Sequence, residues 1–503
     1  MKRRKRALLM TTVASLQRLR LTNRAGFWIR WRLRAALALG VLVLTLTVGA
    51  PVAYAATFTV TNTNDSGPGS LRQAVLDANL LPGPDTITFA VTGTITLTSG
   101  QLTVTDHLTI DGPGAANLTV SGNNASRVLE VSAGVNLNVE GLTVANGAGG
   151  VLGGGIFNNG GTLTVANSVF SANSASLGGG IASPGPLTVT NSTFSGNIAS
   201  DGGGIFGGPL TVIDSTFTGN PAPDGGGLVA FGTSTVRNST FDGNGRPPGG
   251  GGGPSGFGGD GGGILNHGTL SVVNSTFADN SADDGGGINN SSGGSVTLTH
   301  TTFSDNFAGT GGGIFNEAGT LTLQNSIVAN SPAGGNCAGV IIDGGGNLQH
   351  PGLDCGATIP SADPLLLGLA NNGGPTQTMA LPPESPAVDT ALVLWCQPTD
   401  QRGVVRPQGA GCDKGAFELE VAPCPPGDDD RDDDGLDDSR EDLFGNLLND
   451  ADSDDDGIRD GNDDGDDDGE DDEDEDDGTD PCPDDKDGDG EDDEDEDDEE
   501  DDD

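Results

Sequence analysis

The sequence has few aromatic and few basic residues. Its 503 residues include 1 Tyr, 3 Trp and 17 Phe, and after residue 55 there is no Tyr and the only Trp is Trp395. Between residues 57 and 399 the only basic residues are Arg72, Arg127, Arg237 and Arg246. Sugar-binding grooves favour stacking aromatic rings, and cleavage of an acidic polysaccharide needs a basic side chain as catalytic base. These absences argue against an enzyme that cleaves polysaccharides.

Cysteine is absent from the first 330 residues, and all six Cys lie after them. The C-x-x-C spacing of a metal-thiolate site is missing. Pairing of Cys337 with Cys355 and of Cys396 with Cys412 would close two short loops. An even number of clustered Cys favours disulfides, which form in an oxidising compartment. Free thiols are the alternative.

Charge is distributed very unevenly along the chain. The net charge is -51, yet residues 1–55 hold eleven Lys and Arg and no acidic residue. From Gly427 onward there are 47 Asp and Glu against four Lys and Arg, a net of 4 - 47 = -43. Such an acidic balance predicts no nucleic-acid partner.

Residues 1–55 have the pattern of an export signal with an extended basic region. A basic segment is followed by an apolar stretch, residues 35–48, and by Ala53-Tyr54-Ala55, the small-x-small pattern of a cleavage site. The apolar stretch is short for a membrane span. We therefore expect cleavage, no stable membrane span afterwards, and a secreted or cell-surface protein. A retained membrane anchor is the alternative.

The central region lacks the 3.6-residue apolar spacing of helices and contains seven repeats instead. Each repeat opens with three glycines and one Ile or Leu, and about a dozen residues later has N-S-T-F or a variant, then Asn. The triplets begin at Gly153, Gly178, Gly202, Gly225, Gly261, Gly285 and Gly311. A period of roughly 24 residues, interrupted by one insertion at 245–259, predicts units that must stack to bury a core.

Alignment of the repeats places like residues in columns. One apolar column is Ile156, Ile181, Ile205, Leu228, Ile264, Ile288 and Ile314. A second is Phe170, Phe194, Phe217, Phe241, Phe277, Phe303 and Val328. A polar column, expected at bends, is Asn167, Asn191, Asp214, Asn238, Asn274, His300 and Asn325. Alternating T-L-T-V segments predict strands, and the columns predict an all-β, right-handed parallel β-helix, the hand being expected from crossover chirality.

The solenoid is expected to span residues 56–330 and to begin with a capping helix. Ser70 and Gln73 have capping-box spacing, and Leu71, Ala74, Val75 and Ala78 form one apolar face. Residues 86–150 continue the coils with looser periodicity, giving roughly eleven coils. Residues 331–421 are aperiodic and predict a disulfide-containing cap at the other end. Residues 422–503 form an Asp-rich tail expected to be disordered unless cations neutralise it.

Both ends of the solenoid resemble segments of bacterial surface β-helix proteins. Residues 65–79 resemble the CSLREA-type N-terminal segment, but Gly69 stands at its Cys and Gln73 at its Glu, so no disulfide forms there. Matching motifs in order resemble the choice-of-anchor Q domain, at residues 371–376, 385–389, 400–403, 406–407 and 412–418. This family ends surface β-helices ahead of sorting or anchoring tails. The resemblance implies a structural or adhesive protein whose partner is cell wall or extracellular polysaccharide.

The tail holds two candidate calcium loops. Asp430, Asp432, Asp434 and Glu441 fit D-x-D-x-D-G-x5-E, in which oxygen ligands at positions 1, 3, 5 and 12 converge on calcium. The same spacing recurs at Asp452, Asp454, Asp456 and Asp463, with Asp at the last position. The loops resemble thrombospondin type 3 calcium repeats. A solvated polyanion is the alternative.

Two further sets of acidic residues are candidates for a catalytic site, if the protein is an enzyme and not a structural protein. One precedes successive triplets: Asp201, Asp224, Asp260 and Asp284. The other, Asp242, Asp279 and Asp305, could imitate the paired acids of a glycosidase. We expect both sets to be turn residues. Because parallel β-helices host pectate lyases and polygalacturonases, a calcium-dependent polysaccharide lyase or glycoside hydrolase is the alternative to a structural protein.

Overall fold

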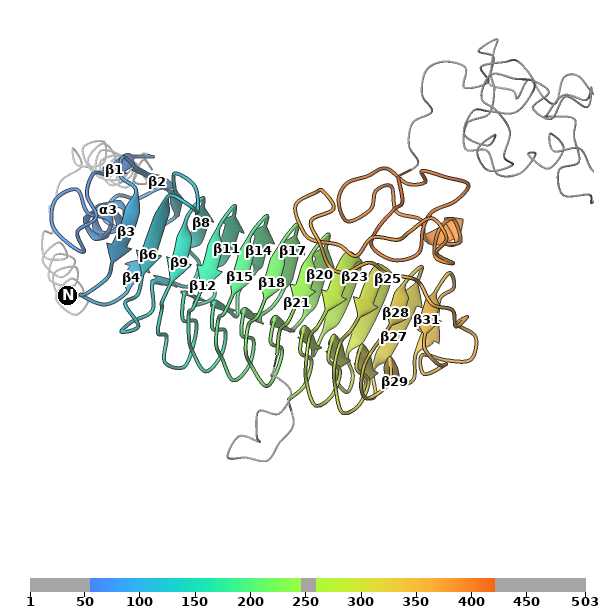
Figure 1. The fold of residues 1–503 in the computed structure, drawn as a ribbon. Helices are drawn as coiled ribbons and strands as arrows, with labels where there is room; N and C mark the ends of the chain where they lie inside the picture. Colours follow the sequence, from blue (N-terminus) through green and yellow to red (C-terminus); the bar gives the residue numbers. More distant parts are fainter. Residues whose placement is uncertain (1–54, 246–258, 421–503) are drawn as a thin grey trace, which may run out of the picture.

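The structure is a computed structural model and describes residues 55–245 and 259–420. These residues form a rod of stacked coils, coloured blue to yellow along its length in Figure 1, with a loop-rich segment alongside. Every strand in the rod pairs in parallel with its neighbours. The predicted all-β parallel solenoid is confirmed.

Each regular coil contributes to three parallel faces. Face 1 consists of β1 (Thr57–Val60), β2 (Asp85–Phe89), β5 (Leu108–Asp111), β8 (Asn136–Glu140), β11 (Thr162–Ala166), β14 (Leu187–Thr190), β17 (Leu210–Ile213), β20 (Thr233–Arg237), the first parts of β23 (Thr269–Ala278) and β25 (Ser295–Ser304), β27 (Thr320–Gln324) and β30 (Ile342–Asp343).

Face 2 consists of β3 (Gly93–Thr96), β6 (Leu118–Ser121), β9 (Thr143–Ala145), β12 (Val169–Ser171), β15 (Thr193–Ser195), β18 (Thr216–Thr218), β21 (Thr240–Asp242), the second parts of β23 and β25, β28 (Ile327–Ala329) and β31 (Leu348–His350). Face 3 consists of β4 (Leu102–Val104), β7 (Leu129–Val131), β10 (Ile156–Asn158), β13 (Ile181–Ser183), β16 (Ile205–Gly207), β19 (Leu228–Ala230), β22 (Ile264–Asn266), β24 (Ile288–Asn290), β26 (Ile314–Asn316) and β29 (Cys337–Gly339).

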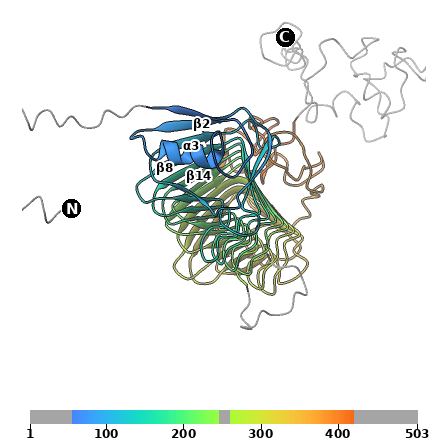
Figure 2. The same cartoon turned by 90° about the vertical axis from the view of Figure 1, so that its left-hand side faces the viewer.

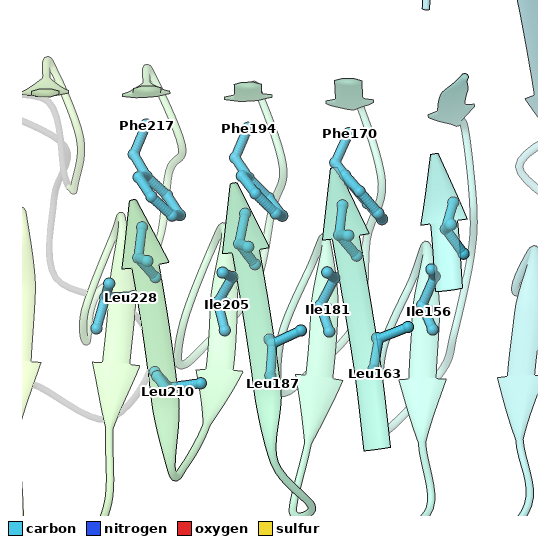
Figure 3. Packing of buried hydrophobic residues seen from close by; sticks show 14 of the residues in the cluster. Ile156, Leu163, Phe170, Ile181, Leu187, Phe194, Ile205, Leu210, Phe217 and Leu228 are labelled. Atoms are coloured by element: carbon cyan, nitrogen blue, oxygen red, sulfur yellow. The ribbon is translucent and has the colours of Figure 1, made fainter. Parts of the chain in front are cut away.

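The two predicted apolar columns fill the bore together with buried Leu, Ile and Val residues of face 1. Six phenylalanines stack along face 2 with ring centroids 4.6 to 4.8 Å apart and planes within 1° to 8° of parallel. The Ile and Leu column of face 3 is fully buried beside them, as Figure 3 shows for four coils. The spacing equals the distance between hydrogen-bonded strands, so each ring packs on its copy one coil away.

Each glycine triplet contains two positions at which only glycine fits. The first glycine of every triplet has positive φ, as predicted for a turn; Gly202 has φ +68°. The third glycine is needed because of crowding. A Cβ on Gly204 would lie 2.5 Å from the carbonyl oxygen of Gly227 and 2.8 Å from the ring of Phe217, so any larger residue would push the coils apart.

Two asparagine ladders hold the bends between coils. The predicted polar column lies between faces 1 and 2, all of its residues have positive φ, and the Asn191 side-chain amide donates to Asn167 Oδ1 at 2.6 Å. A second, fully buried ladder was not predicted: Asn173, Asn197, Asn220, Asn244, Asn280 and Asn306. Its amides donate both to the next Asn and to the Phe carbonyl one coil back.

A single helix covers the first coil. Helix α3 (Leu71–Ala78) buries the four predicted apolar residues and lies across the end of the rod in Figure 2. Ser70 Oγ accepts the Gln73 N–H at 3.2 Å, whereas the Gln73 side chain donates to Asp77 Oδ1 rather than returning to Ser70. Only half of the predicted capping box therefore forms.

The aperiodic segment both closes the far end and turns back along the rod. The predicted Cys337–Cys355 and Cys396–Cys412 disulfides are present. Cys355 and Ile359 pack onto the last coils. Residues 371–420, which we call the flank segment, lie along the side of the rod (Figure 1) and include the short helix η2 (Val393–Trp395). The expected cap at the end of the rod therefore accounts for only part of this region.

The flank segment binds successive strands of face 2 and the bend at Asn325. Gln401 donates to Thr240 Oγ1 at 2.9 Å and accepts from Thr276 Oγ1 at 2.8 Å. Farther along, the Ala416 N–H donates to Thr302 Oγ1 and the Asn325 side chain donates to the Leu392 carbonyl, both at 2.9 Å. Four consecutive coils are thus joined on one side.

Buried ion pairs hold the flank segment together. Arg406 pairs with Glu418 at 2.7 Å and Arg402 with Asp400 at 2.8 Å, and the Arg402 guanidinium lies 3.8 Å from the ring centre of Phe417. These residues belong to the motifs that resemble the choice-of-anchor Q domain. Their local role is to stabilise the segment, because removing one partner of a buried pair costs about 3–5 kcal/mol.

Candidate functional site

Face 3 presents one outward side chain per coil, the middle residue of each three-residue strand. In register these are Thr103, Glu130, Phe157, Ala182, Phe206, Val229, Leu265, Asn289, Phe315 and Ala338. Their neighbours along the strand point into the bore. The outer side of face 3 is therefore largely apolar, but four of these residues are buried: Ala182, Val229, Leu265 and Asn289.

Three rings cluster at the middle of the rod, where face 3 meets its exit edge. The rings of Phe206 and Phe231 meet edge to face with centroids 5.1 Å apart, and those of Phe231 and His267 stack at 5.0 Å. Both phenylalanines are half-buried and His267 is exposed. Phe231 directly follows β19 and His267 directly follows β22, so coil stacking alone brings them together. We call these three residues the aromatic cluster.

Acidic residues line the edge where the chain enters face 3. The four predicted acids before the triplets align as neighbours: Asp201 bridges Asp224, and Asp260 bridges Asp284. The Asp260 N–H donates to Asp224 Oδ1 at 3.0 Å. All four are half-buried. We call them the acid column.

Burial and mutual repulsion keep protons on part of the acid column. Burial, followed by the charge and hydrogen bond of Asp224, raises the pKa of Asp201 to about 6. Burial, followed by the charges of Asp224 and Asp284, raises the pKa of Asp260 to about 6. Like charges one coil apart disfavour simultaneous ionisation, so Asp201 and Asp260 gain their negative charge near pH 6.

Carboxylates act on the aromatic cluster from both edges of face 3. Burial lowers the pKa of His267, and the charges of Asp224 and Glu317 oppose that shift. Glu317 lies at the exit edge, where its Oε2 accepts the Ser292 N–H at 2.9 Å. The surroundings of the rings are therefore anionic.

The second predicted set of acids lies where the strands of face 2 end. Burial raises the pKa of Asp279, and the charges of Asp305 and Asp242 add to this shift. Asp279 and Asp305 have φ of +54° and +59°, which confirms them as turn residues. Asp242 instead ends β21, where its carboxylate accepts from Thr218 Oγ1 at 3.3 Å. Within the described ranges, no three His, Cys, Asp or Glu side chains converge closely enough to enclose a metal ion.

The described arginines of the rod form ion pairs or lie in a regular strand. Arg72 pairs with Asp65 at 2.7 Å, next to the capping helix. Arg127 pairs with Glu130 at 3.1 Å and lies 5.1 Å from the ring centre of Phe157. Arg237 aligns with Ile213 and Val273 on the adjacent coils, so no acid stands beside it in register.

The eight predicted calcium ligands, from Asp430 to Asp463, lie outside the described residues, as do the export signal, Arg246, Cys424 and Cys482. None of the helices in the described part of the chain has the length and apolar character needed to cross a membrane.

Sequence reasoning missed the aromatic cluster because it counted Tyr and Trp and assigned Phe to the bore. A local signal exists in the G-G-G-I-F sequences that end at Phe157, Phe206 and Phe315. The residue after the buried Ile must point outward in a strand, so a Phe there lies on the surface.

Comparisons with known proteins show limited similarity. The model of the Chlamydia polymorphic membrane protein repeat matches residues 300–317. The solved pectate lyase Pel9A is similar at 16% identity with a TM-score of 0.44, covering 72% of this chain and 96% of its own. A mutant of the PL6 family alginate lyase AlyGC is similar at 11% identity with a TM-score of 0.32, covering 74% of this chain and 60% of its own. No curated protein sequence matches the chain.

Proposed function

We propose that this is an exported cell-surface or secreted β-helix protein with a structural or adhesive function and a calcium-binding acidic tail. The observation that carries the proposal is the continuous stacking of the coils. In the described residues, the rings of Phe206, Phe231 and His267 add partly exposed aromatic surface to the rod.

Two features support the location and the partner class. Two disulfides in the C-terminal region fit an oxidising, extracellular compartment. The resemblance to bacterial surface β-helix proteins supports cell wall or extracellular polysaccharide as the partner. The proposal also includes the resemblance to the CSLREA-type segment and to the choice-of-anchor Q domain. The second resemblance implies that the C-terminal region has an anchoring role.

Incubation with polysaccharides tests the structural assignment against the enzymatic alternative. The protein, purified after removal of its export signal, would be incubated with pectin and with alginate in the presence and absence of calcium. We expect no unsaturated products by ultraviolet absorbance and no new reducing ends. Clear turnover would instead establish a polysaccharide lyase or a glycoside hydrolase.

Calcium binding by the tail is tested separately. We expect calcium to change the far-ultraviolet circular dichroism of the full chain, and the change to be lost when Asp430, Asp432, Asp452 and Asp454 are replaced by Asn. An unchanged spectrum of the parent would contradict ordered calcium loops in the tail.

A further inference from the structure

The first two strands of face 1 place a buried carboxylate beside the expected cleavage point. Strand β1 pairs in parallel with β2, with Thr57 opposite Thr86. The preceding residues, Ala56 and Asp85, therefore lie side by side, and the Ala56 N–H donates to Asp85 Oδ1 at 2.7 Å. Ala56 directly follows the small-x-small pattern at residues 53–55. The nitrogen that cleavage releases is thus already in contact with the Asp85 side chain.

Asp85 occupies an apolar column of the bore. Its side chain is buried, like that of Ile87 two residues later in the same strand, and both point to the same side of the sheet. The equivalent position is a buried leucine in each of the next five coils: Leu108, Leu137, Leu163, Leu187 and Leu210. A carboxylate in such a place loses its hydration and requires a compensating partner.

The described residues satisfy only half of this carboxylate. Asp85 Oδ2 is buried and has no hydrogen-bond partner among them, and no described Lys, Arg or His forms an ion pair with Asp85. In the uncleaved chain the amide nitrogen of Ala56 has a single hydrogen, which is donated to Oδ1. An α-ammonium at the same atom has three hydrogens and a positive charge, and charge-assisted hydrogen bonds are the stronger ones.

We infer that export cleavage between Ala55 and Ala56 creates the missing partner: the new α-ammonium of Ala56 pairs with the Asp85 carboxylate and stabilises the first coil. Hydrolysis of this peptide bond by an export protease consumes one water and leaves a carboxylate on Ala55 and the ammonium on Ala56. The inference rests on the export that the proposed function includes. It makes the stability of the first coil depend on removal of the signal.

Two chains that differ only at their first residue test the pairing. One begins at Ala56, and the other has a single additional glycine before Ala56, which restores an amide at this nitrogen and moves the ammonium away. Hydrogen–deuterium exchange of peptides covering residues 57–60 and 85–89 reports opening of the first two strands. We expect exchange there to be about tenfold faster in the glycine-extended chain, equivalent to about 1.4 kcal/mol. Peptides covering residues 320–329, at the other end of the rod, should exchange equally.

Matched variants assign the effect to the buried carboxylate. In Asp85→Asn the added glycine should no longer change the exchange of the first two strands. Asp85→Leu, which restores the residue of the following coils, should give the same result without a buried polar group. Asp111→Asn removes an exposed carboxylate at the end of β5 and should keep the full effect of the glycine.

Mass spectrometry of the protein exported by a bacterial host identifies its first residue, which we expect to be Ala56. Retention of residues 1–55 would overturn the inference together with the export signal of the proposed function, and a different first residue would overturn cleavage at this bond alone. Equal exchange in the two parent chains, or a glycine effect that persists in both Asp85 variants, would overturn the pairing while leaving export intact.

Discussion

Single asparagines differ in importance according to which ladder they occupy. Asn220 belongs to the buried ladder: its Oδ1 accepts from the Asn197 side chain, and its amide donates to the Phe194 carbonyl, both at 2.9 Å. Asn191 belongs to the exposed part of the other ladder and makes one side-chain bond, to Asn167. Burial therefore determines the energetic cost of replacing chemically identical residues.

We predict that Asn220→Ala lowers the free energy of unfolding by about 3 kcal/mol or more, because each buried group left without a partner costs about 1–3 kcal/mol. Asn191→Gly, which keeps the left-handed backbone accessible, should cost under about 1 kcal/mol. Urea unfolding followed by circular dichroism measures both. Equal costs would contradict the distinction between the ladders.

His300 replaces asparagine at one bend of the rod. It is fully buried, its Nδ1 lies 3.2 Å from the Gly415 carbonyl, and its Nε2 lies 3.0 Å from the Asn325 amide. A neutral ring that donates from Nδ1 and accepts at Nε2 satisfies both contacts. Burial, with the nearby charge of Arg406, lowers the pKa of His300 to about 3.

We predict that His300→Asn reduces the loss of stability in acid. Between the folded pKa of about 3 and the unfolded value of about 6.5, only the unfolded chain binds the proton. The His300 contribution to stability is therefore complete above about pH 6.5 and decreases as the pH falls. Thermal unfolding across this window should show a flatter profile for the variant, whereas a profile parallel to that of the parent would contradict the assignment.

At the scale of elements, helix α3 covers the first coil, where a strand edge and the end of the bore would otherwise be exposed. Val75 is buried against the first coils, whereas Leu76, the next residue, is 51% exposed. Uncovered strand edges pair with other chains. The helix is therefore expected to limit association at this end of the rod.

We predict that Val75→Asp displaces the helix and produces concentration-dependent association in sedimentation velocity experiments. Leu76→Asp adds the same charge on the outer face and should sediment like the parent. Association of both variants, or of neither, would show that the helix does not have this protective role.

The periodic elements could be predicted from sequence, and the aperiodic ones could not. Columns such as Phe170 to Phe303 follow from one repeated pattern, and the apolar face of α3 follows from its spacing. The position of the flank segment depends on contacts such as Gln401 with Thr240, which are 161 residues apart and leave no local pattern. The aromatic cluster also depends on distant residues, since Phe231 and His267 meet only after the coils stack.

At the scale of the whole molecule, a complete coil should be removable. Leu177 and Asp201 occupy equivalent positions because they bridge each other in register. Deletion of residues 178–201 connects Leu177 to Gly202, so Leu177 takes the place of Asp201 and every column stays aligned. The stability of a solenoid depends mainly on contacts between neighbouring coils.

We predict that the deletion variant remains folded and that the rod becomes shorter by about one strand spacing, about 4.8 Å. Deletion of residues 178–189 alone would shift the columns out of register and should prevent cooperative unfolding. Small-angle scattering and thermal unfolding distinguish the two variants. Loss of structure in both would contradict modular stacking.

The attachment of the flank segment to four consecutive coils has a consequence for how such a gene can change in length. Duplication of a coil between Thr240 and Asn325 would separate anchoring points that the segment must reach together. Duplication before Asn220 alters no such spacing. Natural length variants of this protein are therefore expected to gain or lose coils in the half of the rod nearer α3, and to keep the four anchored coils constant in number.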